Sequence, residues 1–170
     1  MFKKVTLAAL FGALSLLSVG ALAQTRIAVV DAMKVANDCK EGKRIQSVLK
    51  GVHDQKQNQI TQREAELKAL DEKVKDPKIS PEKKDEIQSQ LNQKMYEYQA
   101  FAKAASEEMD ARTQKMQEEF QEKLTRVLTQ YAQSKGISLV VEKGICLYNA
   151  DALDITTEVI AAMDQAYPGA

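Results

Sequence analysis

The stretch from about residue 34 to residue 135 most constrains what this chain can fold into. Apolar side chains recur there at steps of three and four, and glutamine, glutamate and lysine fill most other positions. This spacing predicts long helices that each carry one apolar seam. Lys56 and Arg63 interrupt the seam, so we expect looser packing than in a tight zipper. The seam positions are Ile45, Leu49, Val52, Ile60, Leu67, Leu70 and Val74, then Ile87, Leu91, Met95, Tyr98, Ala102, Ala105, Met109, Met116, Phe120, Leu124, Val127 and Tyr131.

One break divides this stretch into two arms. Asp76 precedes Pro77, and proline disfavours helical backbone at the residue before it. Ser80 precedes Pro81, an N-cap followed by a residue suited to the first helical position. We therefore expect one helix to end near Lys75 and another to run from Pro81 to a cap at Gly136. So short a turn between two seamed helices predicts an antiparallel coiled-coil hairpin.

Short strands flank the hairpin. Alternation predicts strands at 27–30, 138–141 and 145–148, and a final helix capped by Thr156 and stopped by Pro168. The returning hairpin brings the strands together, but three short strands make a marginal sheet with exposed edges. Pooling strands from several chains removes those edges, so we expect an oligomer. The candidate residues for this body are Ile27, Val29, Val30, Leu139, Val141, Ile145 and Leu147.

The N-terminus has the pattern of an export signal. Lys3 and Lys4 precede an apolar and small-residue stretch, and Ala21-Leu22-Ala23 matches a signal peptidase site. We expect a cleaved signal peptide at 1–23 and a periplasmic protein. A membrane anchor is the weaker interpretation, because the apolar stretch is short for a span and has no basic stop-transfer flank.

Composition and motifs exclude several functional classes. The chain has 24 basic and 24 acidic residues, and removal of Lys3 and Lys4 leaves a net charge of −2 (22 − 24). That balance argues against a nucleic-acid partner. The single histidine, His53, lies in mid-helix without metal-ligand or catalytic spacing. We expect no enzymatic activity, no metal and no cofactor.

The two cysteines leave one question open. Cys39 is placed at the base of the first helix and Cys146 in a late strand, both near the predicted body. An oxidising periplasm permits a disulfide between them, within or between chains. Two separate thiols are the alternative.

Both ends of the chain resemble a known family. Arg26–Asp31 reads Arg-Ile-Ala-Val-Val-Asp, Glu41-Gly42-Lys43 opens the first arm, and the tail holds Leu139-Val-Val-Glu-Lys, Leu147-Tyr148 and Leu153-Asp-Ile-Thr-Thr-Glu-Val-Ile. These motifs resemble the Skp (OmpH-like) family of periplasmic chaperones. The resemblance implies a trimer whose pooled strands form a β-barrel, with three hairpins as tentacles around a cavity for unfolded outer-membrane proteins. Well-known members are strongly basic and this chain is not, so contact with membranes or lipopolysaccharide is not carried over.

The expected fold is thus mostly helical with a small β body. The expected division is a signal peptide at 1–23, an oligomerisation body at 24–36 and 136–170, and a tentacle at 37–135 with its tip near 76–81. The expected function is an ATP-independent holdase that prevents aggregation of unfolded outer-membrane proteins. The alternative is a trimeric coiled-coil scaffold of the cell envelope.

Soft and aromatic side chains in the second arm are the candidates for client binding. Tyr96 and Phe101 fall off the stripe of the other residues, so some apolar surface should face away from the partner helix. Flexible methionine and amphipathic tyrosine suit varied unfolded segments. Ordinary coiled-coil core and rim is the alternative for each residue. The candidates are Met95, Tyr96, Tyr98, Phe101, Met109, Met116 and Phe120.

Overall fold

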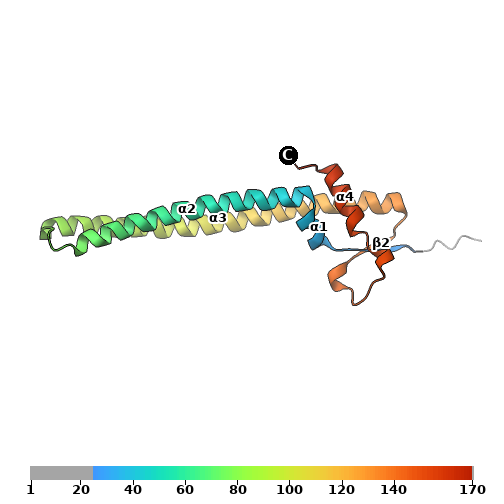
Figure 1. Cartoon of the computed structure of the whole chain (residues 1–170), viewed down its shortest axis with the longest axis horizontal. Coiled ribbons are helices and arrows are strands. Elements are labelled where there is room, and N and C mark those ends of the chain that lie inside the picture. The colour runs from blue at the N-terminus through green and yellow to red at the C-terminus, as the bar shows by residue number, and fades with distance from the viewer. Residues whose placement is uncertain (1–24, 170) are drawn as a thin grey trace, which may run out of the picture.

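The computed structural model describes residues 25–169, which form a long helical hairpin joined to a small body at one end (Figure 1). The expectation of a mostly helical chain with a small β body is confirmed. The predicted signal peptide, 1–23, lies outside the described residues.

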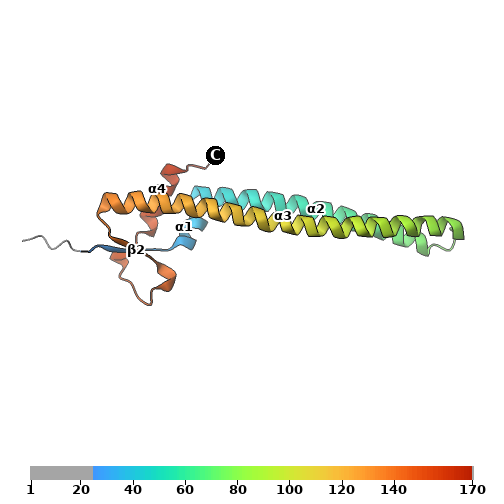
Figure 2. The ribbon, with the colours of Figure 1, turned by 180° about the vertical axis from the view of Figure 1, so that it is seen from behind.

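The two arms of the hairpin begin and end where local sequence predicts. Helix α2 spans Lys40–Lys75 and helix α3 spans Pro81–Lys135. Their 36 and 55 residues correspond to about 54 and 82 Å of helix. The Ser80 side chain accepts a hydrogen bond from the Lys83 backbone N–H at 3.4 Å, and Gly136 ends α3 with φ of 64°. Both predicted caps are confirmed, and the arms lie antiparallel (Figure 2).

The start of the first arm differs from the prediction of one helix from about residue 34. Strand β1 (Ile27–Val30) leads into helix α1 (Ala32–Asp38), and the chain turns at Cys39 before α2 begins. A β-carbon on Gly42 would lie 1.8 Å from the Ala36 carbonyl oxygen, so glycine is what allows α1 to pack this closely on α2.

The sheet has two strands. Strand β2 (Leu139–Glu142) pairs in parallel with β1, and Ile27 lies opposite Leu139 in the register. Parallel strands need a long crossover connection, and the hairpin supplies it.

The predicted third strand at 145–148 is wrong. Residues Lys143–Ile145 form a 3₁₀ turn, and no strand follows in the described chain before a second 3₁₀ turn at Asp151–Leu153. At Val29 the second edge of β1 is already used, because Val29 bridges to Asp154 and its carbonyl accepts the Ile155 N–H at 2.9 Å. Within one chain, residues 145–148 therefore have no free edge of β1 to join.

The body's core lies at the base of the hairpin. Helix α4 (Thr156–Ala166) crosses the base of the hairpin and packs against α1 as well as α2 and α3 (Figures 1 and 2). Thr156 is the first helical residue rather than the cap: its amide and hydroxyl donate to the Asp154 carboxylate, and its hydroxyl accepts from the Asp31 N–H. The buried cluster contains Ala28, Val30, Val35, Cys39, Phe120, Leu124, Val127, Ile155, Val159 and Met163.

Candidate client-binding surface

The hairpin buries little apolar surface beyond its base. Among the described residues of α2 and α3 outside the base, only Leu67, Ile87 and Ala105 are buried. The seam that the sequence predicts is therefore thin along most of the hairpin.

Polar contacts replace apolar packing in the middle of the seam. The Lys56 ammonium pairs with Glu108, 2.5 Å from its carboxylate, and the Arg63 guanidinium lies 4.4 Å from the centre of the Phe101 ring. The Tyr98 hydroxyl donates to Glu64 at 2.7 Å, which raises the pKa of Tyr98. Such contacts add little to stability, because water and salt screen charges at the surface.

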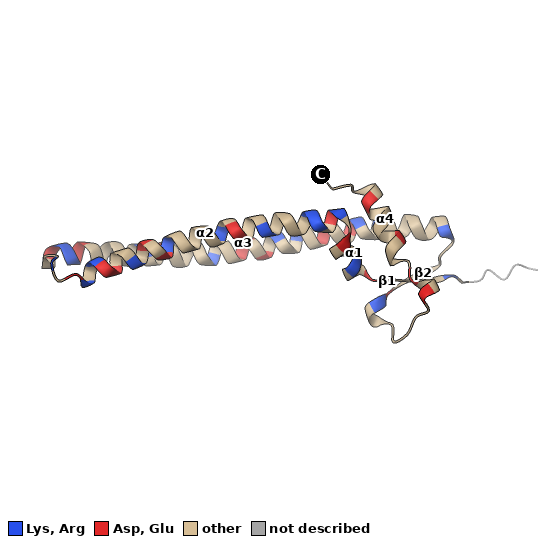
Figure 3. Cartoon of the chain, in the orientation of Figure 1, with Lys and Arg blue, Asp and Glu red and all other residues tan. Residues whose placement is uncertain are grey.

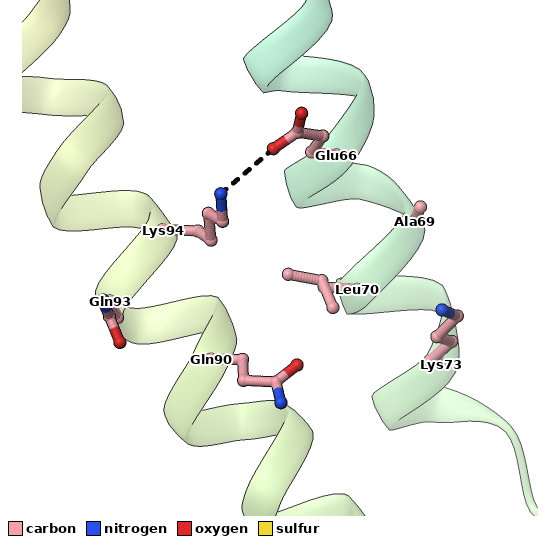
Figure 4. A pocket seen from close by; sticks show the side chains of 7 residues that line it. All are labelled: Glu66, Ala69, Leu70, Lys73, Gln90, Gln93 and Lys94. Carbon is pink, nitrogen blue, oxygen red and sulfur yellow. Dashed lines mark ion pairs between the residues drawn. The ribbon is translucent and has the colours of Figure 1, made fainter.

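The same pattern continues toward the tip. Figure 4 shows Lys94 of α3 reaching Glu66 of α2, with 3.4 Å between their charged atoms, beside the Leu70 side chain. Basic and acidic residues are mixed along both arms, as Figure 3 shows. Neither arm presents the single-sign surface that would attract a strongly charged partner.

The client-binding candidates fall into three environments. Met95 and Tyr96 are exposed, at 41% and 75% of their surface. Tyr98, Phe101 and Met109 are half-buried along the hairpin. Met116 is half-buried and Phe120 is buried, and both lie near the base of α3.

An apolar groove lies where α1 crosses the base of the hairpin, and we call it the shoulder groove. Its volume is about 370 Å³. It joins three helices that are distant in sequence, and Met33, with 71% of its surface exposed, contributes from α1. The sequence did not single out Met33, because only the fold brings α1 against the hairpin. The lining includes Met33 and Ala36 of α1, Ile45 and Leu49 of α2, and Met116 and Phe120 of α3.

A buried carboxylate fixes the base of the hairpin. Glu41 is 4% exposed and accepts hydrogen bonds from Arg44 (2.7 and 2.8 Å) and from Lys123 of α3 (2.6 Å). The Arg44 hydrogen bonds and the Lys123 contact outweigh burial and lower the pKa of Glu41 to about 2. The Tyr167 ring lies 5.3 Å from the Lys123 ammonium, so the C-terminal segment covers these ion pairs of Glu41.

The body leaves large apolar side chains exposed. Val29 and Val30, two of the predicted oligomer residues, are buried within the chain, and Val141 is half-buried. Ile27 and Leu139, at the same end of the sheet, remain 44% and 52% exposed. The segment after β2 is more exposed still: Ile145 76%, Leu147 107% and Tyr148 86%.

Both cysteines are free thiols in this chain. Cys39 is buried in the core, where its sulfur accepts the Gly42 N–H at 3.3 Å, and burial raises the pKa of its thiol. The Cys146 sulfur lies 3.5 Å from the Glu142 carbonyl oxygen. The structure holds no disulfide between them within one chain, and a bond between chains stays a prediction.

The structure also describes the single histidine, the groups that could bind a metal ion and the helices that could span a membrane. His53 is an exposed residue of α2. The described residues hold no cluster of three or more histidine, cysteine, aspartate or glutamate side chains suited to a metal ion. Nor does any described helix combine the length and apolar character needed to span a membrane.

The fold places this chain among helical-hairpin proteins. Its long, sparsely packed hairpin is joined to a small α/β body with exposed apolar side chains. Residues 26–163 match the family model of outer membrane proteins described as OmpH-like. The chain belongs to the OmpH-like family, which confirms the resemblance seen in the sequence.

A solved structure has the same fold. The crystal structure of an OmpH-like candidate outer membrane chaperone from Caulobacter crescentus matches with a TM-score of 0.77 and 18% sequence identity. The match covers 99% of this chain and 93% of that one. No curated protein matches this chain.

Proposed function

We propose that this protein is an ATP-independent periplasmic holdase that binds unfolded outer-membrane proteins and keeps them from aggregating. The observation that carries the proposal is the hairpin's thin seam. Long helices that bury so few of their apolar residues leave side chains such as Met95 and Tyr96 available to a client. Family membership supports a chaperone role, as does the description of the Caulobacter structure.

The free energy for holding a client comes from burial alone. An unfolded membrane protein exposes apolar surface whose removal from water is favourable by roughly 25 cal/mol per Å². Several hairpins around one client multiply weak contacts into useful avidity. No nucleotide is needed for such binding, and release can follow when folding at the membrane buries the same surface.

The working form in this proposal is a homotrimer. The free edge of β2 and the exposed residues Ile145, Leu147 and Tyr148 support association through the body. Residues 145–148, which form no strand in one chain, can pair with an edge from a neighbouring chain. The division into a body at 24–36 and 136–170 and a tentacle at 37–135 is part of the same proposal.

Suppression of aggregation tests this function. A urea-denatured outer-membrane β-barrel protein is diluted with or without the mature chain, residues 24–170, and light scattering is followed. A holdase abolishes the scattering at about one oligomer per client. A coiled-coil scaffold leaves it unchanged, and that result would favour the structural alternative.

A further inference from the structure

The shoulder groove differs in chemistry from four other grooves of the described chain. The other grooves are lined by several charged side chains, for example Glu108, Arg112 and Lys115 in the groove nearest to it along α3. None of the residues that line the shoulder groove is charged. A charged ligand would find no counterion there, so the lining selects for an uncharged one.

The polar groups at the groove are amides. Gln46, Gln117 and Gln121 are exposed residues of its lining, on α2 and α3. A glutamine side chain both donates and accepts hydrogen bonds, as a peptide group does. An apolar floor with amides at its rim fits an extended polypeptide, whose side chains enter the floor while its backbone meets the glutamines.

Two methionines give the groove adaptability. Met33 on α1 and Met116 on α3 both line it, and Met33 keeps 71% of its surface exposed. Unbranched methionine side chains can re-pack around aromatic or aliphatic residues of different shape. The groove therefore suits many related segments rather than one fixed sequence.

The groove also lies near the exposed segment after β2, through which chains could associate. Helix α1 and the exposed segment after β2 both lie beside the base of the hairpin (Figures 1 and 2). If chains associate through that exposed segment, the bases of their hairpins come near one another, and the groove lies at that base. A client held between hairpins would meet it at the base.

We propose that the shoulder groove is the principal anchoring site for clients and takes uncharged, extended segments that alternate apolar and polar residues. Transmembrane strands of unfolded β-barrel proteins have this pattern over about ten residues. The inference rests on the proposed holdase function and names the client segment that binds most tightly. Contacts elsewhere on the hairpin add avidity without comparable individual strength.

The test measures binding of a labelled peptide to the mature chain by fluorescence anisotropy. The probe has about ten residues and alternates Val, Leu and Tyr with Ser, Thr and Gln; a second peptide carries Lys and Glu at the polar positions. Met33→Glu should weaken binding of the neutral peptide roughly tenfold, since it places a charge where apolar surface is buried. Met33→Leu should bind within about twofold of wild type, because its volume and polarity are similar.

Ala65→Glu is the matched control, because it introduces the same charge at an exposed position of α2 outside the groove and outside the client-binding candidates. It should alter the affinity by no more than about twofold, since each contact along the hairpin is weak. Wild type should also bind the charged peptide more weakly than the neutral one. Thermal melts should show Met33→Glu and Ala65→Glu folded as wild type, because both positions are exposed.

Several results would overturn the inference. Equal affinities of wild type and Met33→Glu would do so, as would equal losses in Met33→Glu and Ala65→Glu. Failure of the neutral peptide to bind the wild type would do the same. A change in the oligomer's mass caused by Met33→Glu would show that a second copy covers the groove. Failure of the holdase proposal is distinguishable, because wild type would then leave the full-length client to aggregate.

Discussion

Gly42 holds the turn between α1 and α2 in place. In α2, replacing glycine by alanine ordinarily stabilises the helix by about 1 kcal/mol. At Gly42 the new β-carbon would meet backbone, the Ala36 carbonyl oxygen, and backbone cannot step aside as a flexible side chain can. The local gain in helix propensity is therefore outweighed by the loss of the α1–α2 contact.

Gly42→Ala should accordingly destabilise the protein by about 2 kcal/mol or more. Gly51→Ala, in the same helix with nothing within 4 Å of its added carbon, should stabilise it by up to about 1 kcal/mol. Urea unfolding at a fixed protein concentration measures both. Changes of the same sign in the two variants would contradict the packing described for α1.

The ion pairs of the buried Glu41 carboxylate make stability depend on pH. The pKa of Glu41 falls from 4.5 to about 2 on folding, so its ionised form stabilises the native state above pH 4.5. That contribution is lost as pH falls from about 4.5 to about 2, because the unfolded chain takes up the proton first. The shift corresponds to about 3 kcal/mol.

Glu41→Gln should therefore be less stable than wild type by about 3 kcal/mol at pH 7, and the difference should shrink toward zero near pH 2. Asp154, whose pKa is also about 2 because of its hydrogen bonds from Lys143 and Thr156, titrates in the same range. Asp154→Asn removes the second titrating group. The pH dependence measured for Glu41→Gln in that background therefore reports Glu41 alone. A stability difference between wild type and the Glu41→Gln variant that stays constant across the acid range would contradict the assignment.

Helix ends could be predicted from sequence and tertiary pairing could not. Pro77, Ser80-Pro81 and Gly136 act through their own backbone and neighbours, so the arms end where expected. The turn at Cys39 depends on contact between Gly42 and Ala36, which sequence periodicity does not report. Residues 145–148 have strand-like composition, yet they form no strand, because a 3₁₀ turn at Lys143–Ile145 follows β2 directly and Val29 of β1 is already bridged to Asp154.

The candidate site was predictable to a similar extent. Met116 and Phe120 were identified from sequence and do line the shoulder groove. Met33 was missed, because α1 joins the hairpin only after the chain turns at Cys39. The sequence places Phe101 off the apolar stripe, and in the fold the charged groups of Arg63 and Lys56 lie 4.4 and 5.8 Å from the centre of its ring.

The hairpin should be less protected from exchange in its middle than at its base. Backbone amides at 120–127 lie over the core, whereas those at 95–110 depend on Ala105 and on polar contacts. Hydrogen exchange followed by mass spectrometry should show faster exchange in the second segment. Replacing the Lys56–Glu108 pair by two leucines should slow that exchange by roughly fivefold, since it restores apolar seam positions. Equal exchange along α3 in the wild type would contradict a thin seam.

Association of whole chains should depend on the exposed segment after β2. Leu147 is fully exposed and is absent from the core, so Leu147→Asp should leave each chain folded and lower the solution mass of the oligomer. Tyr96→Asp, an exposed aromatic on the hairpin, serves as the control and should leave the mass unchanged. If neither variant lowers the mass of the oligomer, the interface lies elsewhere.

The most direct test of the central claim is the solution mass of the mature chain, residues 24–170, alone and after dilution of a urea-denatured outer-membrane β-barrel protein. A trimeric holdase should have three chain masses alone and should form a soluble complex of one trimer with one client. A folded monomer that leaves the client to precipitate would contradict both the pooled-strand body and the holdase function.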